Sequence, residues 1–332
     1  MIVRDFLQWV GHAPACERAE ATSALARACL YSDLSPDDLA AVEGVMLMLL
    51  DDRSPLVRQA LAEALAASPI APPAVIMALA ADQPQIAAMV YAASPLFVDA
   101  DLVDAVVSAD CGIQAAIAGR AALPRAVAAA IAEVGAEEPC LILVKNLSAD
   151  IAPLSIDRIV ERFGHLAAIR EALLARDDIL AATRQTLVTK LSETLTGFVV
   201  DRAWLKADRA RRIAREACEK ATVTIAADTP QTELRPLIRN LCASGQLTAG
   251  LILRALLSGN IALFEEAMAE LTGIPVMRIS GIVHGRGEEA CTLCLKGRSY
   301  RPRPILLSRR RSWRCAKGSS TTRAARRGSS AA

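Results

Sequence analysis

Residues 49–66, LLDDRSPLVRQALAEALA, decide the fold class. A polar turn at residues 51–54 leads into Pro55, and proline in a first helical turn costs nothing because its missing N–H would be unpaired there anyway. Apolar residues then recur at steps of three and four, the period of an α-helix. We therefore predict a helix over residues 56–67, with Arg58 and Glu63 off its buried face. That face comprises Leu56, Val57, Ala60, Leu61, Ala64 and Leu65.

Similar proline-containing turns occur on both sides of this segment. Upstream, Ser35-Pro36-Asp37-Asp38 has the N-cap, the first-turn proline and the acidic residues of a helix start. Downstream, Ser68-Pro69, Gln83-Pro84 and Ser94-Pro95 interrupt Ala/Leu/Val-rich runs. Two short helices and a turn are too small to bury their own apolar faces, so such units must stack on neighbours. The sequence predicts an all-α solenoid of short helix pairs.

The deciding segment resembles the HEAT-repeat signature, in which an aspartate in the turn precedes a helix that begins with a Val-Arg pair. Asp52, Val57 and Arg58 match it. Together with residues 67–106 and 115–135, it resembles a bacterial family of unknown function with HEAT-like repeats and a helical C-terminal half. The resemblance covers roughly residues 20–289 and implies a fold, but no activity and no catalytic residue.

The spacing of the proline-containing turns changes in the second half of the chain. Residues 179–226 contain no proline and one glycine, and we predict two longer helices there, the second over residues 201–226. Shorter helices follow at 233–243, 248–257, 261–271 and 275–284. We therefore expect three parts: HEAT-like repeats over residues 1–178, a helical C-terminal subdomain over 179–289, and a basic tail over 290–332.

The composition supports the all-α prediction and indicates in which cellular compartment the protein is expected. The chain is 53% hydrophobic but only 3% aromatic, so its core must consist of small aliphatic residues that favour helices over sheets. No apolar run reaches the ~18 residues of a membrane span, and the N-terminus lacks the pattern of a signal peptide. The nine cysteines form no pairing pattern. We expect a cytoplasmic protein with reduced thiols.

The charge is divided between the body and the tail. No acidic residue follows Glu289, whereas twelve lysines and arginines do, which leaves 26 basic and 36 acidic residues in the body. The amphipathic period also ends near residue 290. We interpret residues 290–332 as the product of a shifted reading frame. The alternative is a basic disordered arm for nucleic acid or an anionic membrane.

One group of basic residues is a candidate partner-binding site. On a helix over 201–226, five cations would share a face: Arg202, Lys206, Arg209, Arg212 and Arg215. That face suits an acidic partner segment. The alternatives are a solvated face with i,i+4 ion pairs and a nucleic-acid stripe. Acidic residues interleave with the cations and the body is net negative, so we expect no nucleic-acid binding by the body.

Catalytic and metal signals are weak. His12, His165 and His284 lie far apart, and Cys291-x-x-Cys294 lacks the second ligand pair of a zinc site. No phosphate-binding loop occurs. We therefore expect no cofactor, no metal and no enzymatic activity. The sequence favours a protein-interaction scaffold that binds a protein or peptide, with a HEAT-like nucleic-acid-binding or processing protein as the alternative.

Truncation tests the prediction for the tail. Removal of the residues after Glu289 should leave the melting temperature unchanged within about 2 °C, because a disordered arm adds little to a folded body. Thermal unfolding followed by circular dichroism measures it for both lengths. A sharp drop on truncation would show that the segment is folded.

Overall fold

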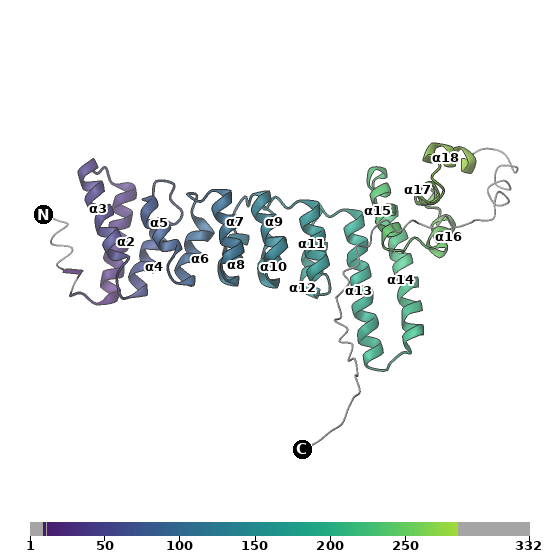
Figure 1. The fold of residues 1–332 in the computed structure, drawn as a ribbon, viewed down its shortest axis with the longest axis horizontal. Coiled ribbons are helices and arrows are strands. Elements are labelled where there is room, and N and C mark those ends of the chain that lie inside the picture. Colours follow the sequence, from purple (N-terminus) through teal and green to yellow (C-terminus); the bar gives the residue numbers. More distant parts are fainter. Residues whose placement is uncertain (1–8, 11, 285–332) are drawn as a thin grey trace, which may run out of the picture. The chain divides into compact units, whose positions relative to one another are not determined.

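The computed structural model describes residues 9, 10 and 12–284. These residues form seventeen helices, α2 to α18, and no strand, which confirms the all-α prediction (Figure 1). The chain divides into two units, Met1–Ile279 and Ser280–Ala332. The predicted tail, residues 290–332, and the pair Cys291 and Cys294 lie outside the described residues.

The helices before residue 178 are short. All but the first have eight to fourteen residues. They are α2 (Ala15–Tyr31), α3 (Pro36–Leu49), α4 (Pro55–Leu65), α5 (Pro73–Ala80), α6 (Pro84–Ala93), α7 (Asp99–Ser108), α8 (Cys111–Ala118), α9 (Arg125–Val134), α10 (Glu137–Lys145), α11 (Pro153–Phe163) and α12 (Ala167–Leu174).

Two helices of 21 residues follow, and then shorter ones return. One of the shorter helices ends at Gly273, whose φ of 69° lies in the left-handed region that favours glycine. The six are α13 (Ala181–Asp201), α14 (Ala207–Ala227), α15 (Gln231–Ala243), α16 (Ala249–Leu257), α17 (Ile261–Thr272) and α18 (Val276–His284).

The helix that decides the fold forms where predicted, but its buried face is rotated. Leu56 was expected in the core and is 54% exposed, whereas Ala62 is fully buried. Proline occupies the first position of the helix, so Leu56 lies in the first helical turn. Arg58 was expected off the buried face, yet its side chain is only 12% exposed because it is held between two aspartates.

The helices contact their near neighbours in chain order. In one set α4 contacts α2 and α6, and α8 contacts α6 and α10; in the other, α9 contacts α7 and α11. Contacts between elements two apart are expected of stacked helix pairs. Helices α2 to α12, with the segments that connect them, are here named the stack. The HEAT-like solenoid and the boundary at residue 178 stay predictions. The buried apolar residues form one large cluster from Ala26 to Leu187 and another from Ala181 to Ala267.

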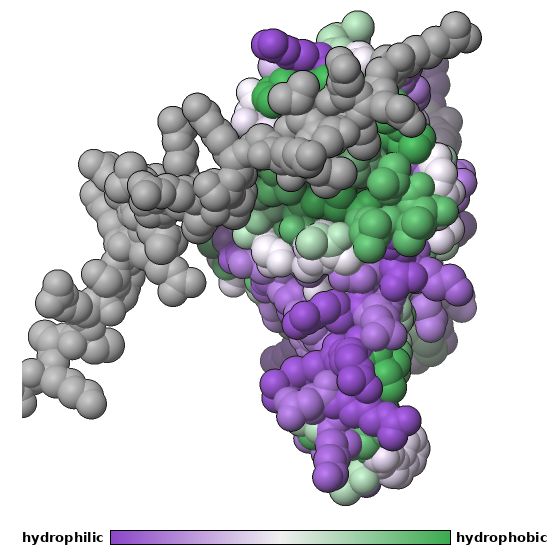
Figure 2. Space-filling model, turned by 90° about the vertical axis from the view of Figure 1, so that its right-hand side faces the viewer, coloured by the Kyte–Doolittle hydropathy of each residue, from purple (hydrophilic) through white to green (hydrophobic). Residues whose placement is uncertain are grey.

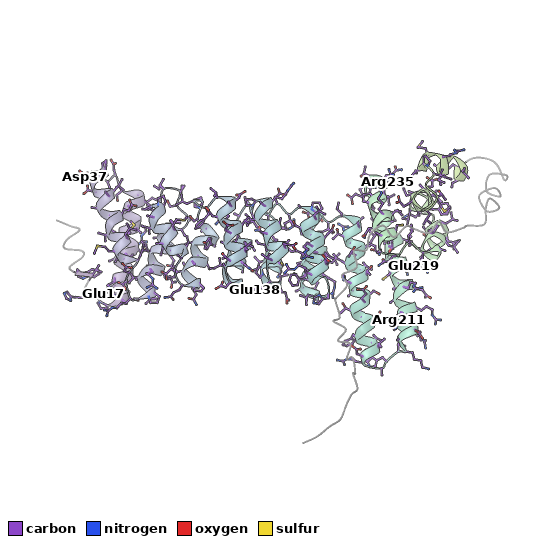
Figure 3. The ribbon with its side chains drawn as sticks, in the orientation of Figure 1. Glu17, Asp37, Glu138, Arg211, Glu219 and Arg235 are labelled. Carbon is purple, nitrogen blue, oxygen red and sulfur yellow. The ribbon has the colours of Figure 1, made fainter. Side chains whose placement is uncertain are left out.

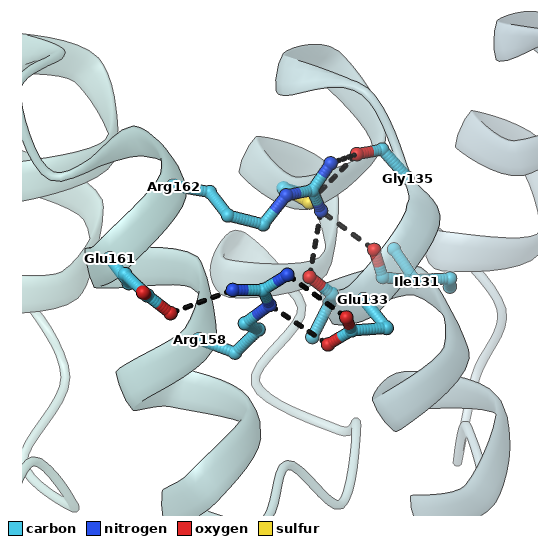
Figure 4. Close-up of polar contacts among 8 residues, drawn as sticks. Ile131, Glu133, Gly135, Arg158, Glu161 and Arg162 are labelled. Carbon is cyan, nitrogen blue, oxygen red and sulfur yellow. Dashed lines mark hydrogen bonds and ion pairs between the residues drawn. The ribbon is translucent and has the colours of Figure 1, made fainter. Parts of the chain in front are cut away.

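Arginine side chains join consecutive helix pairs. Arg120 donates to the carbonyl oxygens of Tyr91 and Ser94, at the C-terminus of α6. Arg162 makes the same contact with α9, donating to Ala132 and Gly135 at 2.7 Å each (Figure 4). The last carbonyls of a helix have no partner within it and carry partial negative charge, so a guanidinium satisfies both needs.

Two ion pairs act in the same way near the N-terminus. Arg18 donates to both carboxylate oxygens of Asp52, at 2.9 and 2.8 Å, and this hydrogen bonding holds the pKa of Asp52 below its usual value. Burial would raise the pKa of Asp82, but the hydrogen bond from Arg58 and that from the Gln83 amide outweigh it, and the pKa is lowered. Both carboxylates therefore stay ionised in the fold.

Removing one arginine tests this connection. Arg120→Met leaves two helix-end carbonyls without their cationic donor, so we expect the free energy of unfolding to fall by about 2–3 kcal/mol. Arg162→Met should cost a similar amount. The matched control is Arg27→Met on the exposed side of α2, which should change stability by less than about 0.5 kcal/mol. Urea unfolding measures the free energy of unfolding of all three variants. Equal losses of stability for the Arg120 and Arg27 variants would contradict the role given to the arginines that bind helix-end carbonyls.

Candidate functional site

The candidate site lies on the hairpin formed by α13 and α14, which pack side by side in opposite directions (Figure 1). Within the described residues, hydrogen bonds and ion pairs between this hairpin and other helices come from one end of it. Thr183 donates to Asp157 at 2.7 Å, and Glu219 accepts from Thr248 at 2.7 Å. Residues 191–217, here named the distal half, make none. In Figure 3, Arg211 lies on this distal half and Glu219 nearer the other helices.

The turn of the hairpin is held by a stacked cation. The Arg202 guanidinium lies 4.4 Å from the ring centroid of Phe198 and 5.8 Å from that of Trp204. The two rings meet edge to face with centroids 5.7 Å apart, a geometry that aromatic pairs prefer. Ala203, between them, has φ 55°, in the left-handed region. The turn is therefore built from interactions within the hairpin.

The predicted basic stripe does not lie on one helix face. The second long helix begins at Ala207, not at residue 201, and Arg202 and Lys206 are the residues that flank the turn. Three residues advance 300° around a helix, so Arg209, Arg212 and Arg215 are each displaced by about 60° from the last. The three spread over about 120° of α14. This corrects the single-face interpretation.

The described residues show little pairing among these cations. Arg211 and Asp208 form an ion pair of 3.8 Å, at a spacing of three residues. No hydrogen bond to another side chain and no ion pair is found there for Lys206, Arg209 or Arg215. The distal half therefore presents unpaired positive charge on a body that is net negative.

An apolar groove of about 460 Å³ runs along the hairpin. Ser192 and Thr196 supply its only side-chain oxygens, and Leu191, Leu195 and Ile213 lie along it exposed. The lining consists of Val188, Leu191, Ser192, Leu195, Thr196, Val199, Leu205, Ala210, Ile213, Ala214, Ala217, Cys218 and Ala221.

A polar hollow of about 600 Å³ lies on the other side of the helix–helix contact. The two hollows share Ser192, Thr196, Ala214 and Cys218, which mark the line along which α13 and α14 meet. Arg211 and Arg215 line the polar hollow together with Glu193 and Glu219. The hairpin thus has an apolar face and a polar face, and Arg215 belongs to the polar one.

A family model matches residues 86–324, most of the chain. The family is DUF2336, described as an uncharacterised protein conserved in bacteria. The chain belongs to the DUF2336 family. No curated protein matches the chain, and no solved structure does.

The DUF2336 match confirms the predicted kinship with a bacterial family of unknown function. It begins in α6 and contains the whole α13–α14 hairpin, whereas α2 to α5 lie before it. It also runs into the segment after residue 289. The truncation described above therefore bears on a part of the chain that the family model includes.

The other predicted candidates are not brought together. His12 and His165 lie in different parts of the stack, and no group of three or more His, Cys, Asp or Glu residues suited to a metal occurs among the described residues. Burial raises the pKa of the Cys140 thiol to about 11, so this cysteine is a protonated core residue. None of the described helices is long and apolar enough to cross a membrane.

A second exposed apolar surface lies on α16. Leu253, Leu256 and Leu257 are exposed, while Leu251 and Ala255 of the same helix are buried. Figure 2 shows hydrophobic residues gathered in the upper part of that view and mainly hydrophilic residues over the outer side of α14 below. No described residue shows what covers the α16 surface.

The groove was missed in the sequence, although a signal for it exists. Apolar residues recur at Val188, Leu191, Leu195 and Val199, and smaller ones at Ala210, Ala214, Ala217 and Ala221. That period indicates a seam between two helices. It does not reveal that none of the helices α2 to α18 covers the seam, since this depends on how far the neighbouring helices reach.

Substitutions at the groove test whether it is open. Ile213 is 47% exposed, so Ile213→Ala should lower the free energy of unfolding by less than about 1 kcal/mol. Ile238 is fully buried, and Ile238→Ala should cost about 2–5 kcal/mol. Urea unfolding of both variants measures the difference. A loss at Ile213 as large as that at Ile238 would mean that the groove is closed in solution.

Proposed function

We propose that this DUF2336 protein is a protein-interaction scaffold that binds a helical segment of a partner in the α13–α14 groove. The observation that carries the proposal is an apolar groove on a hairpin whose distal half makes no hydrogen bond or ion pair with another helix among the described residues. Exposed apolar side chains in one patch are typical of surfaces that bind other proteins.

The dimensions of the groove favour a short helix as its occupant. It extends along α13 from Val188 to Val199, which at 1.5 Å per residue is about 17 Å, or three turns of a helix. A seam between two helices accepts a third in the way that amphipathic helices occupy hydrophobic grooves. The lining residues of α13 are mostly large and those of α14 mostly small. The bottom of the groove therefore has ridges and hollows into which the side chains of a third helix can pack.

The lining argues against a small-molecule or catalytic site. A ligand pocket combines an apolar wall with a few convergent polar groups that fix orientation. Here Ser192 and Thr196 are the only oxygen-bearing side chains of the lining, and both lie on the same helix one turn apart. Catalysis would need titratable groups in the groove, and Cys218 is its only ionisable lining residue.

A nucleic-acid-binding function is the second candidate, carried by the cations of the distal half. Binding to phosphates requires positive charge along a continuous path. Arg209, Arg212 and Arg215 instead point around α14, and the body is net negative. These features favour a protein partner over DNA or RNA.

Site-specific photo-crosslinking tests the proposal in the bacterium that makes the protein. A photoreactive amino acid in place of Leu195, on the groove, should capture a partner protein. Leu154 on α11 is the matched control, because it is an exposed leucine at 82% on the stack. Equal capture from both positions, or capture of nucleic acid alone from position 195, would contradict the groove as the binding site.

A further inference from the structure

The cations around the groove point to the chemistry of its occupant. We infer that the groove takes an acidic amphipathic helix, with an apolar face on the groove and carboxylates along its flank; this rests on the proposed function. From Arg202 to Arg215 the chain carries six lysines and arginines and one acidic residue, Asp208. The whole distal half, residues 191–217, carries six lysines and arginines and four acidic residues, so it is net positive on a net negative body.

The helix period assigns particular cations to the margins of the groove. Counting 100° per residue from Ala214, Ile213 and Ala217 lie toward the groove, and Arg209 and Lys220 lie beyond Ile213 on the same side. Both cations are exposed. At the turn, Arg202 and Lys206 border the end of the groove, where Leu205 lines it. Glu216 lies on the same side, between Arg209 and Lys220 along the helix, so this outer margin of α14 carries two cations and one carboxylate and is net positive.

The remaining arginines of α14 are directed elsewhere. Arg215 lines the polar hollow on the opposite side of the hairpin. Arg212 lies about 160° from Ala214, away from the apolar groove, and it lines neither hollow. These two residues provide controls with the same charge on the same helix.

A second copy of the chain fits the groove less well. A strip about 17 Å long and two helices wide covers on the order of 350 Å², well below the ~800 Å² per partner of a stable interface. Two copies would also bring basic margins together. The segment 290–332 carries twelve cations and no carboxylate, so it would be repelled from the same margins.

Two designed peptides probe the inference on the full chain. Both are fluorescein-labelled 18-residue helices with the same leucine and alanine face; one has glutamates on its polar face and the other has lysines. In fluorescence anisotropy the glutamate peptide should bind at least tenfold more tightly than the lysine peptide at low salt. Higher salt should reduce that ratio, because exposed charges are screened.

Charge reversal then locates the interaction. The double variant Arg209→Glu, Lys220→Glu should bind the glutamate peptide at least tenfold more weakly than the unchanged chain, and it should bind the lysine peptide more tightly. Arg212→Glu with Arg215→Glu makes the same charge change off the groove and should alter binding less than twofold. Circular dichroism establishes that both double variants remain folded.

The other outcomes overturn the inference in distinguishable ways. Suppose that both peptides bind equally well and that Ala217→Glu abolishes this binding. The result would reject an acidic partner, but the proposed function would stand. Absence of binding by either peptide would reject the inference, and capture from position 195 would then decide the proposed function separately. A dimer in light scattering that Ala217→Glu dissociates would assign the groove to a second copy. Duplex DNA or phosphatidylserine vesicles whose binding requires Arg209 and Lys220 would assign it to those ligands.

Discussion

The packing of successive helix pairs depends on arginine side chains that reach into a neighbouring pair. Arg18 and Arg58 bind carboxylates 34 and 24 residues away. Arg120 and Arg162 bind helix-end carbonyls 26 to 30 residues earlier. Short helices cannot bury their own apolar faces and leave unpaired carbonyls at each end. A guanidinium offers several donors in a fixed plane, and so it joins two units while satisfying two acceptors.

The same constraint explains why the hairpin differs from the stack. In α3 to α12 the helices have eight to fourteen residues, and helices of one pair contact those of the next. α13 and α14 have 21 residues each, and their bonds to other helices come from the end that holds Thr183 and Glu219. The distal half then depends on one helix–helix seam and the Arg202 stack at its turn.

Local signals in the sequence predicted much of the fold. Ser35-Pro36 begins a helix whose Ser35 hydroxyl accepts from the Asp38 amide at 3.2 Å, and the glycine at 273 ends one. These signals act over a few residues, so they can be read without the fold. The start of α14 was placed six residues early, because Arg202 to Lys206 contain no proline or glycine. The turn is made instead by Ala203 in a left-handed conformation.

The site was less predictable because its properties arise between elements. The five cations were recognised, but their directions depend on where α14 begins. The burial of Arg58 and the exposure of Leu195 depend on neighbours that lie far away in the chain or do not reach that position. An amphipathic pattern shows that a face is apolar, and only the packing shows whether another helix covers it.

Hydrogen exchange of the chain alone tests the central claim, that the distal half of the hairpin extends past the contacts that hold the stack. Amides of residues 191–217 should exchange through local opening, at least a hundredfold faster than amides in α9 and α11 once intrinsic rates are removed. Amides of residues 183–189, which lie against α11 and α15, should be protected like the stack. Equal protection along the whole of α13 and α14 would contradict the account.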